Sequence, residues 1–144
     1  MAATYRDTLL RRAGNILIAP LARLGLAGKR AHILTVPGRK TGRNYSTPVM
    51  LVFHEGRRWL VSPYGERSWV RNARAAGSVT LTRARRSERV RIEEVDAHTA
   101  APILREYLRG IPVTKPYFDA SPDSPLEDFA AEAARHPVFR IEPP

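Results

Sequence analysis

Cysteine is absent from this sequence of 144 residues, which excludes disulfide bonds and thiolate metal sites. The composition is compatible with a reducing compartment. The four histidines, His32, His54, His98 and His136, lie far apart in the sequence. None of them groups with aspartate or glutamate at metal-ligand spacing. We therefore predict that the protein has no metal site.

Motifs of self-sufficient catalytic sites are missing as well. The sequence contains neither the G-x-S-x-G turn of serine hydrolases nor the Gly-rich P-loop of nucleotide-binding enzymes. No nucleophile and base can be paired, so we predict no catalytic side chain. An enzyme with this sequence would depend on a bound cofactor for its chemistry.

Acidic and aromatic residues are scarce relative to basic ones. There are 14 aspartates and glutamates against 24 lysines and arginines, a net charge of +10, and aromatic residues make up 8%. This charge favours an anionic partner, whether nucleic acid, acidic lipid or a polyanionic cofactor. Barrels that bind nucleic acid stack bases on exposed aromatic side chains. The arginine-rich hairpin expected near residues 83–91 has no aromatic pair, so we expect no nucleic-acid partner.

Residues 4–27 repeat apolar side chains at three- and four-residue spacing, which predicts a helix. The segment is too short and too charged to span a bilayer, and it lacks the cleavage site of a secretory signal. Two interpretations stay open. The helix either packs against the domain or lies, apolar face down, on an anionic membrane surface. We expect a cytoplasmic protein, which the second interpretation places on the inner face of the plasma membrane.

The rest of the sequence alternates short strand patterns with helical ones. Strands are expected at residues 30–36, 48–54, 58–62, 79–82, 89–93 and 138–142. The run at 48–54 is nearly all apolar, so we expect it to be buried on both faces. Helices are expected at 68–76, ended by Gly77; at 97–109, capped by Asp96 and ended by Gly110; and from a capping box at Ser124 to about residue 135. This order indicates a single α+β domain, residues 1–144, with an antiparallel sheet or small barrel. Within it, 1–27 form the helical segment, 30–95 the core, and 96–144 the last helices and strand.

The stretch at residues 37–48 connects the first two expected strands and concentrates positive charge. Arg39, Lys40 and Arg43 lie beside two glycines, with hydroxyl and amide side chains in the same stretch. Glycine lets backbone N–H groups approach a ligand closely, and successive N–H groups can form an anion-binding concavity. The cations can add charge-assisted hydrogen bonds to phosphate or carboxylate. The stretch is either a solvated basic loop or an anion site, and the added polar groups favour the anion site.

Two segments resemble the deazaflavin-dependent nitroreductase family. The first is Leu34-Thr35-Val36-Pro37-Gly38-Arg39-Lys40-Thr41-Gly42-Arg43, followed by Thr47-Pro48 and an apolar strand. The second, residues 69–79, resembles the family's Trp-x-x-Asn-x-x-Ala-x-Pro helix, with Gly77 where proline is usual. The match covers residues 30–95. The family belongs to the flavin/deazaflavin oxidoreductases of actinobacteria. The resemblance implies a mostly antiparallel split β-barrel of about six strands, with an N-terminal helix and flanking helices.

The resemblance also implies coenzyme F-420, an 8-hydroxy-5-deazaflavin with a polyanionic phospholactyl-oligoglutamate tail. By position, the basic loop would hold the tail, while the other residues would lie along, edge or pack beside the ring. The implied cofactor-binding residues are Arg39, Lys40, Thr41, Arg43, Asn44, Thr47, Pro48, Ser62, Pro63, Tyr64, Gly65, Trp69 and Asn72. The implied substrate wall consists of Tyr64, Tyr117 and Phe118.

The function implied by the resemblance is transfer of hydride from reduced F-420 to an apolar acceptor such as a quinone, an activated alkene or a nitro compound. Three alternatives remain: an FMN- or haem-binding relative, a non-catalytic carrier of cofactor or lipid, and a basic nucleic-acid-binding barrel. FMN carries a single phosphate, so a loop this basic favours F-420. The protein would position ring and acceptor and stabilise developing negative charge.

Overall fold

The structure is a computed structural model that describes residues 29–142. Seven antiparallel strands form one curled sheet, a half-barrel, in the order β2-β1-β5-β6-β7-β4-β3. This confirms the predicted α+β class and split-barrel architecture. The strands are β1 (Ala31–Pro37), β2 (Asn44–Met50), β3 (Val52–His54), β4 (Arg57–Val61), β5 (Ser78–Arg83), β6 (Arg86–Glu94) and β7 (Val138–Ile141). The helices are α2 (Ser68–Ala76), α3 (Ala97–Gly110), α4 (Leu126–Glu132), and the short 3-10 helices η1 (Pro112–Tyr117) and η2 (Ala133–Arg135).

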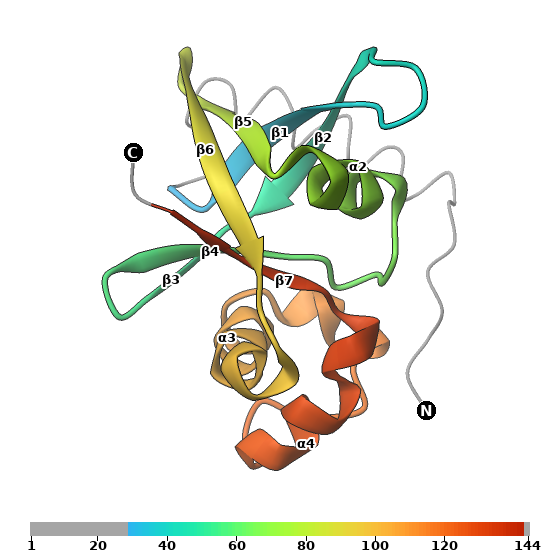
Figure 1. Cartoon of the computed structure of the whole chain (residues 1–144). Helices are drawn as coiled ribbons and strands as arrows, with labels where there is room; N and C mark the ends of the chain where they lie inside the picture. Colours follow the sequence, from blue (N-terminus) through green and yellow to red (C-terminus); the bar gives the residue numbers. More distant parts are fainter. Residues whose placement is uncertain (1–28, 143–144) are drawn as a thin grey trace.

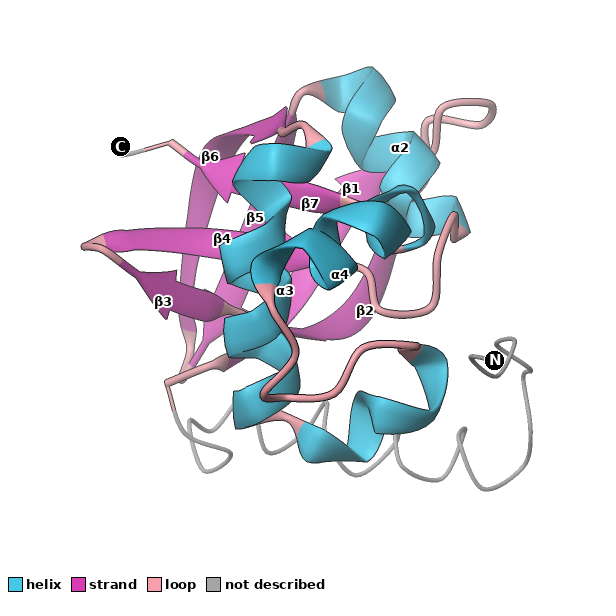
Figure 2. Cartoon of the chain, turned by 90° about the horizontal axis from the view of Figure 1, so that it is seen from below, coloured by secondary structure: helices cyan, strands magenta, loops and turns pink. Residues whose placement is uncertain are grey.

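The helices cover the sheet in two places, and each place has its own core (Figures 1 and 2). Helix α2 packs against β1, β5 and β6, where Val70 and Ala73 join the apolar side chains of the curled sheet. Helices α3 and α4 pack against each other, and α3 also contacts β3, β4 and β7. The second core is built around side chains such as Trp59, Leu104 and Phe129.

The apolar run at residues 48–54 does not form one strand, and that expectation was wrong. The ladder with β1 begins earlier, at Asn44, and ends at Met50, while β3 pairs with β4 instead. Leu51 lies between the two strands, fully buried, and its N–H donates to the Arg30 carbonyl at 2.8 Å. Nor is the run buried on both faces, since Phe53 is 38% exposed on the edge strand β3. The split of this run explains why there are seven strands.

Local signals fixed two helix ends as expected. Gly77 adopts a left-handed conformation at φ 73° and its N–H donates to the Ala73 carbonyl at 2.8 Å, which ends α2. Asp96 caps α3, because its Oδ1 accepts the Thr99 N–H at 2.8 Å. This hydrogen bond lowers the pKa of the Asp96 carboxyl.

Two other helix-end predictions were wrong. Gly110 is the last residue of α3 rather than the residue that stops it, and Ile111 is the C-cap, whose N–H donates to the Tyr107 carbonyl. Ser124 does not cap α4, because its hydroxyl accepts the Ser121 N–H at 2.8 Å within a preceding turn. Pro125 occupies the cap position instead, without a side-chain hydrogen bond.

The helix expected at residues 4–27 lies outside the described residues. Among the helices of residues 29–142, none is long and apolar enough to cross a membrane. The same residues contain no group of three or more His, Cys, Asp or Glu side chains that could hold a metal ion.

Candidate functional site

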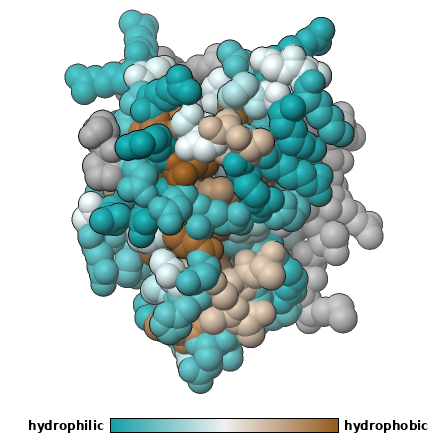
Figure 3. Space-filling model, in the orientation of Figure 1, coloured by the Kyte–Doolittle hydropathy of each residue, from teal (hydrophilic) through white to brown (hydrophobic). Residues whose placement is uncertain are grey.

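A cavity of about 610 Å³ opens between the β1–β2 loop, α2, residues 61–68, and the segment that joins α3 to η1. This volume is typical of small-molecule and cofactor sites. Figure 3 shows that hydrophilic side chains dominate the face of the molecule seen in Figure 1, with apolar patches between them. The cavity is lined by Gly38, Arg39, Lys40, Thr41, Tyr45, Ser46, Thr47, Pro48, Val49, Met50, Val61, Pro63, Tyr64, Arg67, Ser68, Trp69, Asn72, Tyr107, Ile111, Val113 and Thr114.

Most of the residues predicted to bind a cofactor come together in this lining, although they derive from separate parts of the chain. Arg39, Lys40, Thr41, Thr47, Pro48, Pro63, Tyr64, Trp69 and Asn72 all line the cavity. Only the family resemblance predicted this grouping, because these segments become neighbours through the folding of the sheet and α2 and not through their spacing in the sequence.

Four predicted cofactor residues lie outside the lining. Arg43 and Asn44 are exposed at the end of the β1–β2 loop. Ser62 is buried and its hydroxyl donates to the Gly65 carbonyl at 2.6 Å, so both residues shape the segment that carries Pro63. Their predicted contacts with a cofactor remain predictions.

The predicted substrate wall is only partly assembled. Tyr64 lines the cavity, and the ring of Tyr117 packs edge-on against it with centroids 4.7 Å apart. Phe118 does not reach the cavity. It is 2% exposed and stacks on the His136 ring at 4.1 Å. The reason is η1, which turns Val113 toward the cavity and carries Phe118 inward.

The missed lining residues differ in how they could have been found. Tyr45 and Ser46 belong to the strand that follows the basic loop. Val113 is an apolar residue in a proline-rich segment, and its side chain is 77% exposed. By contrast, Tyr107 lies inside α3 and reaches the cavity only because α3 packs beside β4. No local pattern marks that position.

The β1–β2 loop satisfies its own backbone. The Gly38 N–H donates to the Arg43 carbonyl at 2.7 Å, and the Gly42 N–H donates to the Gly38 carbonyl at 2.9 Å. These two amides therefore do not form the expected anion-binding concavity. A side chain at Gly38 would come within 2.6 Å of the Tyr45 ring, so glycine allows that ring to close over the loop. The side chains of Arg39, Lys40 and Thr41 line the cavity and can bind an anion there.

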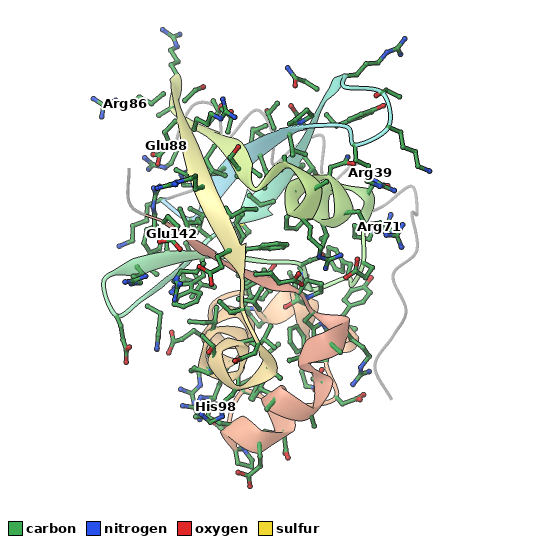
Figure 4. All side chains as sticks on the ribbon, viewed as in Figure 1. Arg39, Arg71, Arg86, Glu88, His98 and Glu142 are labelled. Carbon is green, nitrogen blue, oxygen red and sulfur yellow. The ribbon has the colours of Figure 1, made fainter. Side chains whose placement is uncertain are left out.

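Asn72 fastens the loop to α2. Its Oδ1 accepts two hydrogen bonds from Arg39, at 3.1 Å from the backbone N–H and at 2.8 Å from Nη1. Asn72 is 5% exposed, whereas Arg39 extends from the loop beside α2 (Figure 4). The buried amide therefore fixes the direction in which an exposed guanidinium leaves the loop.

An ion-pair cluster holds the opposite side of α2. Arg74 Nη2 donates to Glu66 Oε1 at 2.7 Å, and its Nε donates to Glu94 Oε1 at 2.7 Å. The hydrogen bond from Arg74 lowers the pKa of the Glu66 carboxyl, and Arg71, 3.8 Å away, adds to the effect. The cluster ties residues 62–67 to α2 and β6.

The charge along the cavity is one-sided. Arg39, Lys40 and Arg67 line it, and no aspartate or glutamate does so among the described residues. Apolar side chains such as Met50 and Val113 line its other portion. Such a cavity suits a ligand with an anionic part and a flat apolar part.

A family model for the F420H(2)-dependent quinone reductase matches residues 18–117. The chain belongs to this family. It is a deazaflavin-dependent oxidoreductase, and coenzyme F-420 is its cofactor. The resemblance inferred from the two sequence segments is thereby confirmed.

Solved structures share the fold at low sequence identity. An F420-H2-dependent reductase has 17% identity and a TM-score of 0.56, covering 79% of this chain and 95% of that chain. A haem-binding protein from Mycobacterium smegmatis has 15% identity and a TM-score of 0.52, covering 96% and 52%. A FAD-binding protein from Mesorhizobium loti has 16% identity and a TM-score of 0.50, covering 87% and 86%. A search of curated proteins found no match. The fold therefore occurs with several cofactors, and the family match decides among them.

The lining residues fit the cofactor of the family. Arg39 and Lys40 with the Thr41 hydroxyl supply donors for phosphate and carboxylate oxygens. Pro48 and Trp69 supply flat apolar surface for a ring system. The donors and the apolar surface lie in one cavity, as a ring with a charged tail requires.

Proposed function

We propose that the protein transfers hydride from reduced coenzyme F-420 to an apolar acceptor such as a quinone, an activated alkene or a nitro compound. The observation that carries this proposal is the one-sided cavity, with three cations, no described carboxylate, and an apolar portion that reaches η1. The deazaflavin supplies the hydride when it is bound. The protein's own residues would bind, orient and exclude water.

The division of labour follows from the lining. Arg39, Lys40 and Thr41 would hold the anionic tail. Trp69, held against Phe139 at 6.3 Å between ring centroids, would support the ring system. Apolar side chains of Ile111 and Val113 would receive the acceptor beside the ring. This apolar portion would exclude water from the reacting atoms, which strengthens the interaction of the lining cations with developing negative charge.

The charge of the cavity supports F-420 over two alternative cofactors. FMN carries one phosphate, which does not need three cations. A haem iron is commonly held by histidine or cysteine, and neither is present among the described lining residues. A non-catalytic carrier would bind the same cofactor without turnover. Measured turnover of an acceptor therefore distinguishes an enzyme from a carrier.

Separate fluorescence titrations with F-420 and FMN, followed by turnover with a water-soluble quinone, test the proposal. We expect tighter binding of F-420, weaker binding as salt rises, and oxidation of reduced F-420 that depends on the quinone. Equal or tighter binding of FMN would reject the cofactor assignment. Binding without turnover of quinone, activated alkene or nitro acceptors would identify a carrier.

We also propose that the protein docks on anionic membrane, where apolar acceptors dissolve. The net charge of +10 and the exposed cation Arg43, outside the cavity lining, support this location. Co-sedimentation of the full chain with vesicles tests it. We expect binding to vesicles that contain anionic lipid, release by high salt, and no binding to neutral vesicles. Failure to sediment with anionic vesicles at low salt would contradict it.

A further inference from the structure

Residues 62–67, which we call the wall segment, form one side of the cavity and lie between β4 and α2, outside any strand. Pro63 and Tyr64 line the cavity, and Pro63 has no backbone N–H with which to anchor itself. Arg74 of α2 holds the Glu66 end of the segment, and residues 136–137 hold the Pro63 end. The Ser62 N–H donates to the Pro137 carbonyl at 2.9 Å, and His136 Nδ1 lies 2.9 Å from the Pro63 carbonyl oxygen. The position of the wall therefore depends on His136, which does not line the cavity itself.

His136 is held in turn by a buried carboxylate. Its Nε2 lies 2.7 Å from Glu132 Oε1, and the two side chains are 2% and 3% exposed. The Glu132 carboxylate also accepts the N–H groups of Asp119 at 3.1 Å and Ala120 at 2.8 Å. The network is complete, since no buried side-chain nitrogen or oxygen of residues 29–142 lacks a hydrogen-bond partner. A fully satisfied buried network of this kind is rigid.

The hydrogen-bond partners define the ring orientation. A carbonyl oxygen only accepts, so the Nδ1 of His136 carries a hydrogen and donates it to Pro63. The second ring nitrogen, Nε2, makes its hydrogen bond with Glu132 Oε1. A flipped ring would place carbon atoms against both oxygens, which leaves one orientation.

A second route leads from the same imidazole to the same wall. The Phe118 ring stacks on His136 at 4.1 Å, and the neighbouring Tyr117 ring packs edge-on against Tyr64 at 4.7 Å. Tyr64 is thus held on one side through the Pro63 backbone and on the other through its ring. Both restraints begin at His136.

We propose that His136, oriented by Glu132, is a positioning residue that sets the cavity wall at Pro63 and Tyr64 and so the fit of the cavity to its occupants. The inference rests on the proposed function for the identity of those occupants. The position of the wall is a separate property that can be measured without cofactor.

Two amide substitutions separate the two hydrogen bonds of the ring. In His136→Asn, the amide nitrogen stands where Nδ1 stood and keeps the bond to the Pro63 carbonyl. In His136→Gln, the longer side chain reaches Glu132 and loses the bond to Pro63. Both variants lose the ring stack on Phe118, and the shorter asparagine leaves the larger gap, so a loss of packing alone would disturb His136→Asn at least as much as His136→Gln. His98→Gln is the matched control, because His98 is exposed near the start of α3, away from the cavity (Figure 4).

The first measurement is amide hydrogen exchange of residues 64–67 in the full chain without cofactor. We expect faster exchange in His136→Gln than in His136→Asn, with His98→Gln unchanged. The second measurement is steady-state kinetics and F-420 titration. We expect the F-420 Kd or the acceptor KM to rise about tenfold in His136→Gln and less than about threefold in His136→Asn, with a smaller change in kcat.

Equal exchange in the two amide variants, or equal kinetics, would assign His136 a purely structural role and overturn the proposal. If His136→Gln does not fold, Glu132→Gln replaces it. This variant keeps the Nδ1 bond and removes the carboxylate that orients the ring, so we expect a smaller shift in the same direction. Exchange identical to the wild type would again overturn the proposal. If the wild-type protein binds no F-420, the proposed function fails, and the exchange comparison alone decides the position of the wall.

Discussion

The Oδ1 atom of Asn72 receives two hydrogen bonds from Arg39, one from the backbone and one from the guanidinium. The acceptor is buried on α2 and the donor belongs to an exposed loop. These hydrogen bonds hold the loop that carries Arg39 and Lys40 against α2, the helix that carries Trp69. Asn72, which we expect to hydrogen-bond beside the cofactor ring, lines the cavity and also orients a neighbouring cation.

Asn72→Ala should weaken F-420 binding mainly through Arg39. We expect Asn72→Ala and Arg39→Ala each to raise the Kd about tenfold, since hydrogen bonds to charged groups contribute about 1.5–3 kcal/mol and 1.4 kcal/mol corresponds to tenfold. The double variant should be little worse than either single one, because both remove the same interaction. The measurement is a double-mutant cycle by fluorescence titration, with Arg71→Ala as the control on the same helix. Additive losses would show that Asn72 acts independently of Arg39.

Lys40 and Arg43 provide a matched pair of loop cations. Both are exposed, but only Lys40 lines the cavity. Either substitution by alanine removes one positive charge, so both should reduce the salt dependence of F-420 binding. Lys40→Ala should raise the Kd by about tenfold and Arg43→Ala by less than about threefold, because a direct contact is worth more than a distant charge. Titrations at two salt concentrations measure both effects, and equal losses would place the tail across both side chains.

Val113 tests the acceptor end of the cavity. It is 77% exposed in the free protein and lines the cavity from η1. Val113→Ser should raise the KM for an apolar quinone by about three- to tenfold, because roughly 25 cal/mol is lost for each Å² of apolar contact. F-420 binding should not change. Leu126→Ser on α4 is the control, since Leu126 is an exposed apolar residue outside the lining. A loss of F-420 binding in Val113→Ser would move the acceptor site elsewhere.

The sequence predicted the fold class well because the signals that decide it are local. Hairpin turns such as Glu55–Gly56, with φ of 50° and 75°, and the left-handed Gly77 mark element ends without reference to the rest of the chain. The break at Leu51 left no such mark, because it depends on which strand each half of the run pairs with. The pairing partners of a strand are set by the tertiary structure, so the apolar pattern of residues 48–54 predicts a single strand.

The same distinction explains the site. Arg39, Trp69 and Asn72 stand in recognisable segments, and the structure brings them to one cavity. The positions of Tyr107 and Phe118 follow from how α3 packs on the sheet and η1 packs against α3, which no spacing rule conveys. Glu132 and His136 are four residues apart in the sequence, but neither their hydrogen bond nor the contact of His136 with Pro63 was predicted, because both depend on how the chain turns after α4.

Glu66 provides a test of pH dependence. Its hydrogen bond from Arg74 lowers the pKa of the Glu66 carboxyl in the folded protein. The pair therefore stabilises the fold above the ordinary glutamate pKa of about 4.3, and this stabilisation is lost as pH falls through the lowered value. At pH 7, Glu66→Gln should have a lower free energy of unfolding than the wild type and so melt at a lower temperature. The loss should be below about 1 kcal/mol, because solvent screens a half-exposed pair. The difference in melting temperature between the two proteins should narrow as the pH is lowered below the ordinary glutamate pKa.

Thermal melts from pH 7 to pH 3 measure this difference. Glu106→Gln on α3 is the control, because Glu106 has no ion pair among the described residues. A gap that stays constant down to pH 3 would show that Glu66 and Arg74 interact through packing and not through charge.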